Sequence, residues 1–374
     1  MFRMSRLLLA LSLSLVAYPH LSQAQSNSTG AVFVMTNGVN NNQVISYKRN
    51  ADGSLSDRHY YATGGRGSGG VTDPLASQGA LTLTDDDRFL LAVNAGTGDI
   101  SVFQVNGSAL TLLGTTPCGG SAPVAVAQKH HLVYVVNAGG ASNVTAFHLT
   151  SKGLLKQIPN STTFLTTANS GASSLAFSPD GNTLLVTEKL TNDIDAFPIH
   201  PDGRLGSIVV TASAGPGLFG VVFAPNGTVI TTETGPTGGN NASAASSYLL
   251  NSNGTLSVIT ASAPTLANAT CWHVVTPDGK HVYTSNPGSS SVSGFSIGSN
   301  GALTAIDGIV LAILPSGSTN LDVAVTLDGK YIYTIDSGTG AVSALSINAD
   351  GTVTALPDTS GLNANVGFNG IAAM

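Results

Sequence analysis

A repeated unit of about 48 residues constrains the fold of this chain more than any other feature. Its clearest copy runs from Trp272 to Ile306 and reads WHVVTPDGKHVYTSNPGSSSVSGFSIGSNGALTAI. Apolar and polar residues alternate in short runs, and segments rich in Gly, Asn and Pro separate the runs. Period-two alternation predicts β-strands, and glycine-containing segments between them predict hairpin turns. Each copy therefore predicts four short antiparallel strands.

Other copies of the unit start at Ser174 and Asp322, and weaker copies start near Ala80, Pro123 and Gly220. Each copy ends its second predicted strand with an amide or an acidic residue: Asn94, Asn137, Glu188, Glu233, Asn286 and Asp336. Asn94 and Asn286 are four repeats and 192 positions apart, which gives the spacing of 48. A four-stranded propeller blade takes about 40 to 50 residues. The repeats therefore predict six complete blades.

A seventh blade is split between the two ends of the chain. Residues 32–36 and 43–47 read as its second and third strands, but no inner strand precedes them. The missing strand matches GFNGIAA, from Gly367 to Ala373. We therefore predict an all-β, seven-bladed β-propeller in which the C-terminal strand completes the first blade, because such closure removes open sheet edges. Residues 25–374 form one domain in this prediction, with no helix longer than a turn.

The N-terminus and the composition predict a secreted glycoprotein. Arg3 and Arg6 precede an apolar run too short to span a bilayer, and Ala24 offers a cleavage site, so residues 1–24 read as a signal peptide. We expect an extracellular or cell-wall location, no membrane span and a monomer. The sequence also contains eight Asn-x-Ser/Thr acceptors for N-glycosylation: Asn27, Asn106, Asn143, Asn160, Asn226, Asn241, Asn253 and Asn268.

Charge excludes one class of partner. Only 9% of the residues are charged, and the formal net charge is −6 with no basic cluster, so nucleic acid is not an expected partner.

The two cysteines, Cys118 and Cys271, could pair in an oxidising compartment, and the sequence leaves this open. The segment GRGSGG at 65–70 nominally fits a dinucleotide motif, but no helix follows it, so we expect no nucleotide or other cofactor.

The repeats resemble a known family. The SPDG and TPDG turns and the VVNAGG and TSNPGSSSVSGF hairpins resemble those of the lactonase-type propellers, which include 6-phosphogluconolactonases and fungal carboxymuconate cyclases. The resemblance covers nearly all of the mature chain and implies a propeller fold with lactone chemistry. The family's enzymes resemble one another in an inner-strand Arg-His pair and a Glu after the second strand. Here those positions hold Ser173, Ser174 and Lys189.

Comparing the blades with one another singles out candidate site residues. When the six predicted inner strands are aligned on the turns that follow them, one position is apolar in every blade except at His273. The position before it holds mostly small residues, except for Trp272 and Asp322. His273 is either a packed histidine or an acid–base group. Trp272 and Asp322 either plug the channel mouth or form a stacking platform beside a carboxylate. The strand-end acids either satisfy turn amides or form a calcium rim, although we assign no metal ligand.

The candidate catalytic residues are therefore His273 as acid–base, Asp322 as its partner, and Lys189 or Arg66 as oxyanion stabiliser. Candidate substrate-binding residues are Trp272, Gln78, Ser174 and Glu188. With so few cations near the mouth, phosphosugar and tricarboxylate substrates are not expected.

Two functions remain open. One is a secreted hydrolase or cycloisomerase acting on a lactone or a ring-opened acid at the channel mouth. The other is a non-catalytic, adhesin-like binding protein of the cell surface. Convergence of the Trp272, His273 and Asp322 side chains at the mouth would favour the first function, and a plugged channel would favour the second. A histidine sealed between blades would not suit the acid–base role.

Overall fold

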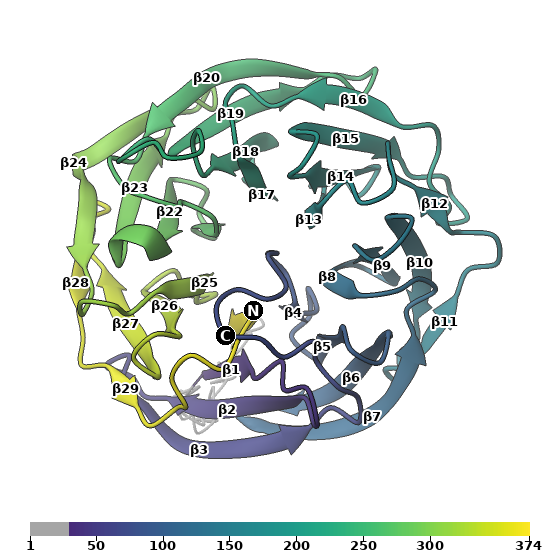
Figure 1. Ribbon diagram of the computed structural model, residues 1–374, viewed down its shortest axis with the longest axis horizontal. Coiled ribbons are helices and arrows are strands. Elements are labelled where there is room, and N and C mark those ends of the chain that lie inside the picture. The colour runs from purple at the N-terminus through teal and green to yellow at the C-terminus, as the bar shows by residue number, and fades with distance from the viewer. Residues whose placement is uncertain (1–29) are drawn as a thin grey trace, which may run out of the picture.

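The computed structural model describes residues 30–374, so the predicted signal peptide (1–24) and the Asn27 acceptor lie outside the described residues. Seven antiparallel sheets surround one central channel, as Figure 1 shows. The propeller prediction is thus confirmed. The single helical element in this part of the chain is a 3₁₀ turn, η1 (Pro287–Ser289). No helix within residues 30–374 has the length and apolar character needed to cross a membrane.

Each blade runs from an inner strand at the channel to an outer strand at the rim. Blades 1 to 4, from the inside outwards, are β30 (Ile371–Ala373), β1 (Ala31–Met35), β2 (Gln43–Arg49), β3 (Leu55–Ala62); β4 (Leu81–Leu83), β5 (Phe89–Asn94), β6 (Asp99–Asn106), β7 (Ala109–Pro117); β8 (Pro123–Lys129), β9 (Leu132–Asn137), β10 (Asn143–Leu149), β11 (Leu155–Gln157) with β12 (Thr163–Phe164); and β13 (Ala172–Phe177), β14 (Thr183–Glu188), β15 (Asp193–Pro198), β16 (Val209–Ala212). Blades 5 to 7 are β17 (Leu218–Phe223), β18 (Thr228–Glu233), β19 (Ala244–Leu250), β20 (Leu256–Pro264); β21 (His273–Val275), β22 (His281–Asn286), β23 (Ser291–Ile297), β24 (Leu303–Ile313); and β25 (Asn320–Val325), β26 (Tyr331–Asp336), β27 (Ala341–Ile347), β28 (Val353–Ala355) with β29 (Thr359–Ser360).

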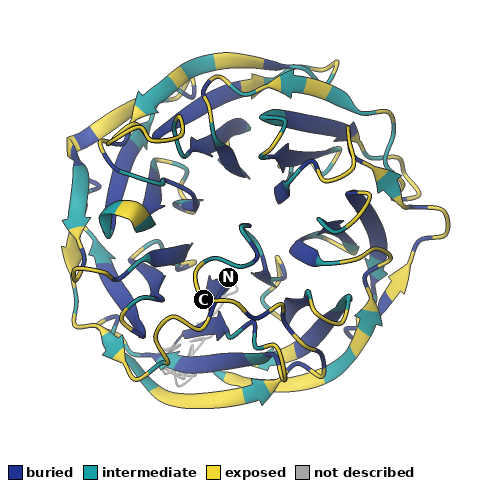
Figure 2. Cartoon of the chain, in the orientation of Figure 1, coloured by how far each residue is buried: buried dark blue, intermediate teal, exposed yellow. Residues whose placement is uncertain are grey.

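The core lies between neighbouring blades. Every residue of β5, β18 and β26 is buried, because the second strand of a blade is covered on both faces by the adjoining sheets. Figure 2 shows this gradient from buried inner and middle strands to exposed outer strands. Burying a large apolar side chain contributes roughly 1.5–3 kcal/mol. The fold therefore rests on many such side chains between the blades.

The ring closes in the predicted manner. β30 pairs antiparallel with β1, with Phe33 opposite Ala372 and Val34 opposite Ile371. Asp322 supports this closure from blade 7, because its Oδ2 accepts a hydrogen bond of 3.2 Å from the Ile371 amide. Its backbone is left-handed, with φ at 51°, beside a β-bulge in β25. Non-glycine residues adopt this conformation at an energetic cost, which the closing contacts offset.

The two faces of the ring differ. We call the end with the tight turns between first and second strands the turn face, and the opposite end the mouth face. The TPDG turn illustrates the turn face: Thr276 donates to Asp278 Oδ1 at 2.7 Å, and the same oxygen accepts the Lys280 amide at 3.1 Å. Short polar side chains favour such turns because they satisfy nearby backbone groups. The PDG motifs are thus structural.

Candidate functional site

A segment of the chain enters the central channel. The connection between blades 1 and 2, Thr63–Ala80, passes along the mouth face and then enters the channel, where Figure 1 shows it in dark blue. We call residues Asp73–Gly79 the plug. The Gln78 amide donates to the Ser173 carbonyl at 2.9 Å, and the Ser77 hydroxyl donates to the Val124 carbonyl at 2.8 Å. The plug thus bonds to the inner strands of the neighbouring blades 3 and 4.

Trp272 holds the plug from blade 6. Its indole Nε1 donates to the Ser77 carbonyl at 2.7 Å, and the side chain is fully buried. Its ring meets the ring of Phe219 edge to face, with 5.0 Å between centroids. Since both the indole edge and its face are occupied, Trp272 presents no free stacking surface to a ligand. Of the two roles considered for it, plugging the mouth fits the geometry.

His273 points away from the channel. Its Nε2 lies 3.1 Å from the Ile230 carbonyl on β18, so the ring sits between blades 5 and 6 and is fully buried. Burial without a charged partner lowers the pKa of this imidazole from 6.5 to about 4. Only its backbone faces the plug, where Gln78 Nε2 donates to the His273 carbonyl at 2.7 Å and Gln78 Oε1 accepts from the His273 N–H at 3.2 Å. This placement fits a packed histidine, and the acid–base role stays a prediction without geometric support.

Asp322 and Glu188 are also engaged in structural contacts. Asp322 is buried against the closing strand, burial raises its pKa to about 7, and no hydrogen bond within residues 30–374 joins it to His273. Glu188 is fully buried and accepts hydrogen bonds from the Thr166 amide at 2.9 Å and the Thr191 hydroxyl at 2.8 Å. Neither carboxylate is presented to the channel, so their predicted roles at the site stay predictions.

Asp73 and Lys189 form the polar centre of the mouth. Lys189 Nζ donates to the Ala76 carbonyl at 2.7 Å, and Asp73 Oδ1 accepts the amide of the same residue at 3.0 Å. Asp73 Oδ1 also accepts from Asn369 Nδ2 at 3.0 Å, whereas no described residue bonds its Oδ2. Both side chains are half-buried. Asp73 Oδ2 and the remaining N–H donors of Lys189 Nζ are thus left without partners among residues 30–374 at one end of the plug.

The electrostatics of this pair suit proton transfer. Burial raises the pKa of Asp73 to about 7, although the Asn369 hydrogen bond and the Lys189 charge act in the opposite direction. Burial lowers the pKa of Lys189, and the charge of Asp73 opposes that shift. A carboxyl group with a pKa near neutrality can both accept and return a proton at physiological pH. Perturbed pairs of this kind gather at functional sites.

Sequence comparison had selected Lys189 but missed Asp73. Asp73 lies in the 18-residue connection between blades, which matches no column of the repeat and so could not stand out against one. The available signal was that Asp73 is the sole acidic residue of that unusually long connection. Arg66 lies in the same connection, with an exposed side chain and a carbonyl held by the Gly96 amide at 2.9 Å. It is therefore a rim residue.

Gln78 and Ser174 line a cavity on the other side of the plug. This cavity has a volume of about 290 Å³ and lies between the inner strands of blades 2 to 5. It opens towards the turn face, where Lys129 and Asp85 border it. The predicted substrate-binding residues thus divide between two ends of one channel.

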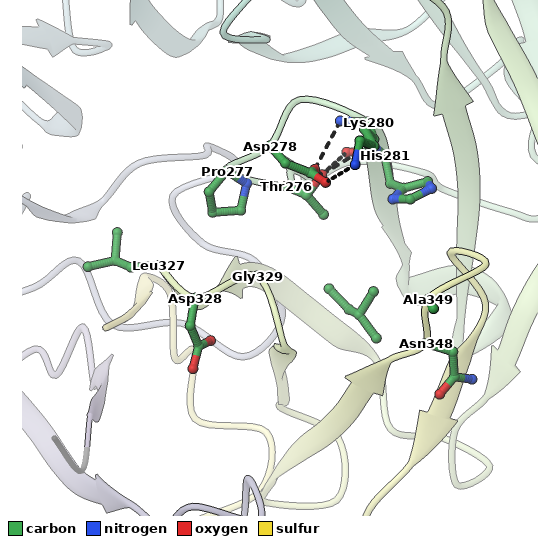
Figure 3. A pocket seen from close by; sticks show the side chains of 11 residues that line it. Thr276, Pro277, Asp278, Lys280, His281, Leu327, Asp328, Gly329, Asn348 and Ala349 are labelled. Carbon is green, nitrogen blue, oxygen red and sulfur yellow. Dashed lines mark hydrogen bonds and ion pairs between the residues drawn. The ribbon is translucent and has the colours of Figure 1, made fainter. Parts of the chain in front are cut away.

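A larger hollow of about 760 Å³ lies between blades 6 and 7 on the turn face (Figure 3). Its charged side chains are already paired. Asp278 bonds Thr276 and forms a 3.2 Å ion pair with Lys280, and Asp328 pairs with Arg49 at 3.3 Å. A third hollow, of about 640 Å³, lies between blades 4 and 5. These hollows offer few free polar groups for recognition.

The strand-end amides and acids belong to the interiors of the blades. Asn94 bonds Ser101 at 2.7 Å, and Asn286 bonds Ser293 at 2.9 Å. Among residues 30–374, no group of three or more His, Cys, Asp or Glu side chains could hold a metal ion. Cys118 and Cys271 are both free and buried.

Comparison with known proteins agrees with this fold. A family model described as lactonase, 7-bladed beta-propeller, matches residues 28–164 and 228–367. No curated protein matches the chain. A solved candidate 6-phosphogluconolactonase from Bacteroides uniformis is similar, with 19% identity, a TM-score of 0.69, and coverage of 93% of this chain and 100% of that one.

Two further solved structures are similar. One is a candidate 6-phosphogluconolactonase from Bacteroides fragilis, with 18% identity, a TM-score of 0.68, and coverage of 94% and 99% of the two chains. The other is a periplasmic gluconolactonase from Pseudomonas aeruginosa, with 16% identity, a TM-score of 0.65, and coverage of 91% and 99%. At these identities the likeness establishes the fold alone.

Proposed function

The chain belongs to the lactonase seven-bladed β-propeller family, and from this premise we propose that it hydrolyses neutral lactones at the mouth of its channel. The observation that carries the proposal is the juxtaposition of Asp73 and Lys189 on the Ala76 peptide, with Asp73 Oδ2 free of partners among the described residues. In this proposal Asp73 is the general base and Lys189 stabilises the oxyanion.

Lactone hydrolysis needs few groups. The Asp73 carboxylate takes a proton from water, the water oxygen attacks the lactone carbonyl carbon, and negative charge develops on the carbonyl oxygen. The Lys189 ammonium lowers the energy of that charge. The ring C–O bond then breaks, and protonated Asp73 returns the proton to the leaving alkoxide. One lactone and one water give one hydroxy acid, and the reverse sequence would be a cyclisation.

The surroundings of the mouth favour a neutral and partly apolar substrate. Val71 (60% exposed) and Leu190 (75% exposed) neighbour Asp73 and Lys189 in the chain. Val39, 57% exposed, lies against the glycine-rich connection beside Gly69. A phosphorylated sugar acid would require a cluster of cations, and Lys189 and Arg66 are the cations that the mouth offers among residues 30–374.

We also propose that the protein is secreted and acts as a monomer outside the cell or in the cell wall. The N-terminal sequence and the Asn-x-Ser/Thr acceptors support this location. Among the described acceptors, five are exposed at the surface: Asn106, Asn160, Asn226, Asn241 and Asn253.

The test is acid release, followed by pH-stat titration, from δ-valerolactone, δ-decalactone, D-glucono-δ-lactone and 6-phosphoglucono-δ-lactone. We expect turnover of the neutral lactones. Asp73→Asn should lower it by about 100-fold or more, the range for a lost general base, and Lys189→Met by roughly 10². Asp307→Asn, an acidic residue exposed on β24, is the matched control and should retain full turnover. Equal turnover by Asp73→Asn would refute the assignment.

A non-catalytic binding protein is the second candidate, and the plug is the observation that favours it. A channel that holds part of its own chain has less room for a small substrate, and this favours binding at the mouth face without catalysis. If no lactone is hydrolysed but calorimetric titration still shows saturable binding of a neutral lactone, the binding function replaces the enzymatic one.

A further inference from the structure

The cavity behind the plug has the features of a second ligand site. Its closed end is the plug itself, because Gln78 is fixed there by three hydrogen bonds: its backbone amide donates to the Ser173 carbonyl, and its side chain bonds the backbone carbonyl and N–H of His273. Its volume of about 290 Å³ corresponds to roughly ten water molecules at about 30 Å³ each. A ligand of about ten non-hydrogen atoms would fill it.

The walls of this cavity are mainly apolar. They include Leu175, Phe177, Val221 and Phe223, from the inner strands β13 and β17. Several polar groups that line it already have partners: Thr82 donates to the Val126 carbonyl at 2.9 Å, and Ser174 lies 3.5 Å from the Val221 carbonyl. The deep part of the cavity therefore offers a hydrocarbon surface and few free hydrogen bonds.

The lip of the cavity carries one cation, Lys129, that has no ion-pair partner among the described residues. Lys129 is half-buried, and its aliphatic stem runs beside Gly181. The other charged lining residue, Asp85, has both carboxylate oxygens hydrogen-bonded within its own surroundings: Oδ2 accepts the His130 amide at 2.8 Å and Oδ1 accepts from Gln128 Nε2 at 3.1 Å. A cation at the rim of an apolar cavity is complementary to an anion with a hydrocarbon body.

We propose that this cavity binds a small amphipathic monocarboxylate, with its hydrocarbon body among Leu175, Phe177 and Phe223 and its carboxylate at Lys129. The plug separates this site from the Asp73–Lys189 mouth. The proposal therefore stands whether or not the mouth hydrolyses lactones.

The chain contains a natural reporter for this site. Trp272 is the only tryptophan, and its indole donates to the Ser77 carbonyl, one residue before Gln78 at the closed end of the cavity. A ligand against Gln78 should alter the strength of that hydrogen bond and thereby shift the indole emission.

The experiment is titration of the full chain with octanoate, which has ten non-hydrogen atoms, by Trp272 emission and by calorimetry. We expect saturable 1:1 binding in both. Octanamide, which has the same shape without the charge, should bind at least 10-fold more weakly. Lys129→Met should weaken octanoate at least 10-fold and leave octanamide unchanged. Lys152→Met, an exposed lysine in another turn of the same face, is the control and should bind octanoate normally.

A cavity-filling change locates the site. Ala176→Phe places a ring among the lining residues and should abolish octanoate binding, while the circular dichroism spectrum verifies folding. Absence of saturable binding to millimolar octanoate overturns the proposal. Equal affinities for octanoate and octanamide, or an unaffected Lys129→Met, overturn the anion assignment, and full binding by folded Ala176→Phe overturns the location.

Discussion

At the scale of single residues, His273 couples folding to pH. Its pKa is about 4 in the folded chain and 6.5 when exposed, because burial disfavours the charged ring. Between these pH values the His273 imidazole is protonated in the unfolded chain and neutral in the folded chain. The free energy of unfolding therefore falls as the pH drops from about 6.5 to 4. Over that window the loss amounts to about 3 kcal/mol.

We predict that His273→Gln removes this loss, since an amide can still donate to the Ile230 carbonyl but cannot be protonated. Urea unfolding of both chains at pH 7.5 and 4.5 measures it. The difference in unfolding free energy between the two chains should move by about 2–3 kcal/mol in favour of the variant at pH 4.5. Buried acids such as Asp322, whose raised pKa acts in the opposite sense, are common to both chains and cancel. A pH-independent difference would contradict the assignment.

Burial also ranks the glycosylation acceptors. Asn143 is buried within β10, and its side chain bonds Asn137 at 3.0 Å and the Ala141 carbonyl at 3.0 Å. Asn106, at the end of β6, and Asn253, in a turn, are both exposed. In a eukaryotic secretory host we predict glycans at the exposed acceptors and an unmodified Asn143, which peptide mapping by mass spectrometry before and after deglycosylation would measure. A fully occupied Asn143 would mean that modification precedes folding of blade 3.

Column comparison identified Trp272 and His273 as unusual, and they are, but it could not say why. Their neighbours across the channel come from the plug, a segment without a counterpart in other blades, so no repeat pattern encodes that contact. The direction of the His273 ring depends on a 3.1 Å bond to Ile230 in the next blade. Such tertiary contacts explain why the residues could be selected from sequence while their roles could not.

At the scale of elements, the repeat predicted the strands well because each blade follows the same period-two pattern and the same turn chemistry. The split blade was also predictable, since an inner strand was missing at one end and present at the other. The path of Thr63–Ala80 was not, because a glycine-rich connection specifies no periodic structure. The plug is instead fixed by hydrogen bonds to blades 3, 4 and 6.

The closing strand gives an element-scale prediction. Removing residues 367–374 deletes β30 together with the buried side chains of Phe368 and Ile371. At roughly 1.5–3 kcal/mol for each large apolar side chain, the loss should exceed about 3 kcal/mol and lower the urea midpoint. A synthetic peptide of residues 366–374 should restore the midpoint when added in excess, because β1 still offers its free edge. An unchanged midpoint in the truncated chain would show that β30 contributes little.

At the scale of the whole molecule, the ring is closed without a covalent staple, because both cysteines are free. The two ends of the described chain meet at the closure: the Met374 amide donates to the Ala31 carbonyl at 2.9 Å, and Arg49 Nε donates to the Met374 carbonyl at 3.1 Å. Blade 1 is therefore the one blade built from both ends. Opening the ring at this point requires β30 to separate from β1, in addition to the separation of neighbouring blade faces.

Circular permutation can measure how much the split blade slows unfolding. Both permutants join Met374 to Gly30 by the same short linker. The first opens between Ser316 and Gly317, in the exposed connection of blades 6 and 7, so every blade is continuous and only face packing closes the ring. The second opens between Gly238 and Gly239, inside blade 5, so the six residue pairs between β18 and β19 still close it.

We predict that the first permutant unfolds at least 10-fold faster in urea than the second, because its ends can part without breaking a strand ladder. Stopped-flow unfolding followed through Trp272 emission measures both rates. The shared linker makes each permutant the control for the other, and matching circular dichroism spectra verify that both form the propeller. Equal unfolding rates would mean that contacts between blade faces, together with the plug that bridges blades 3, 4 and 6, hold the ring closed unaided, and that the split blade adds no kinetic protection.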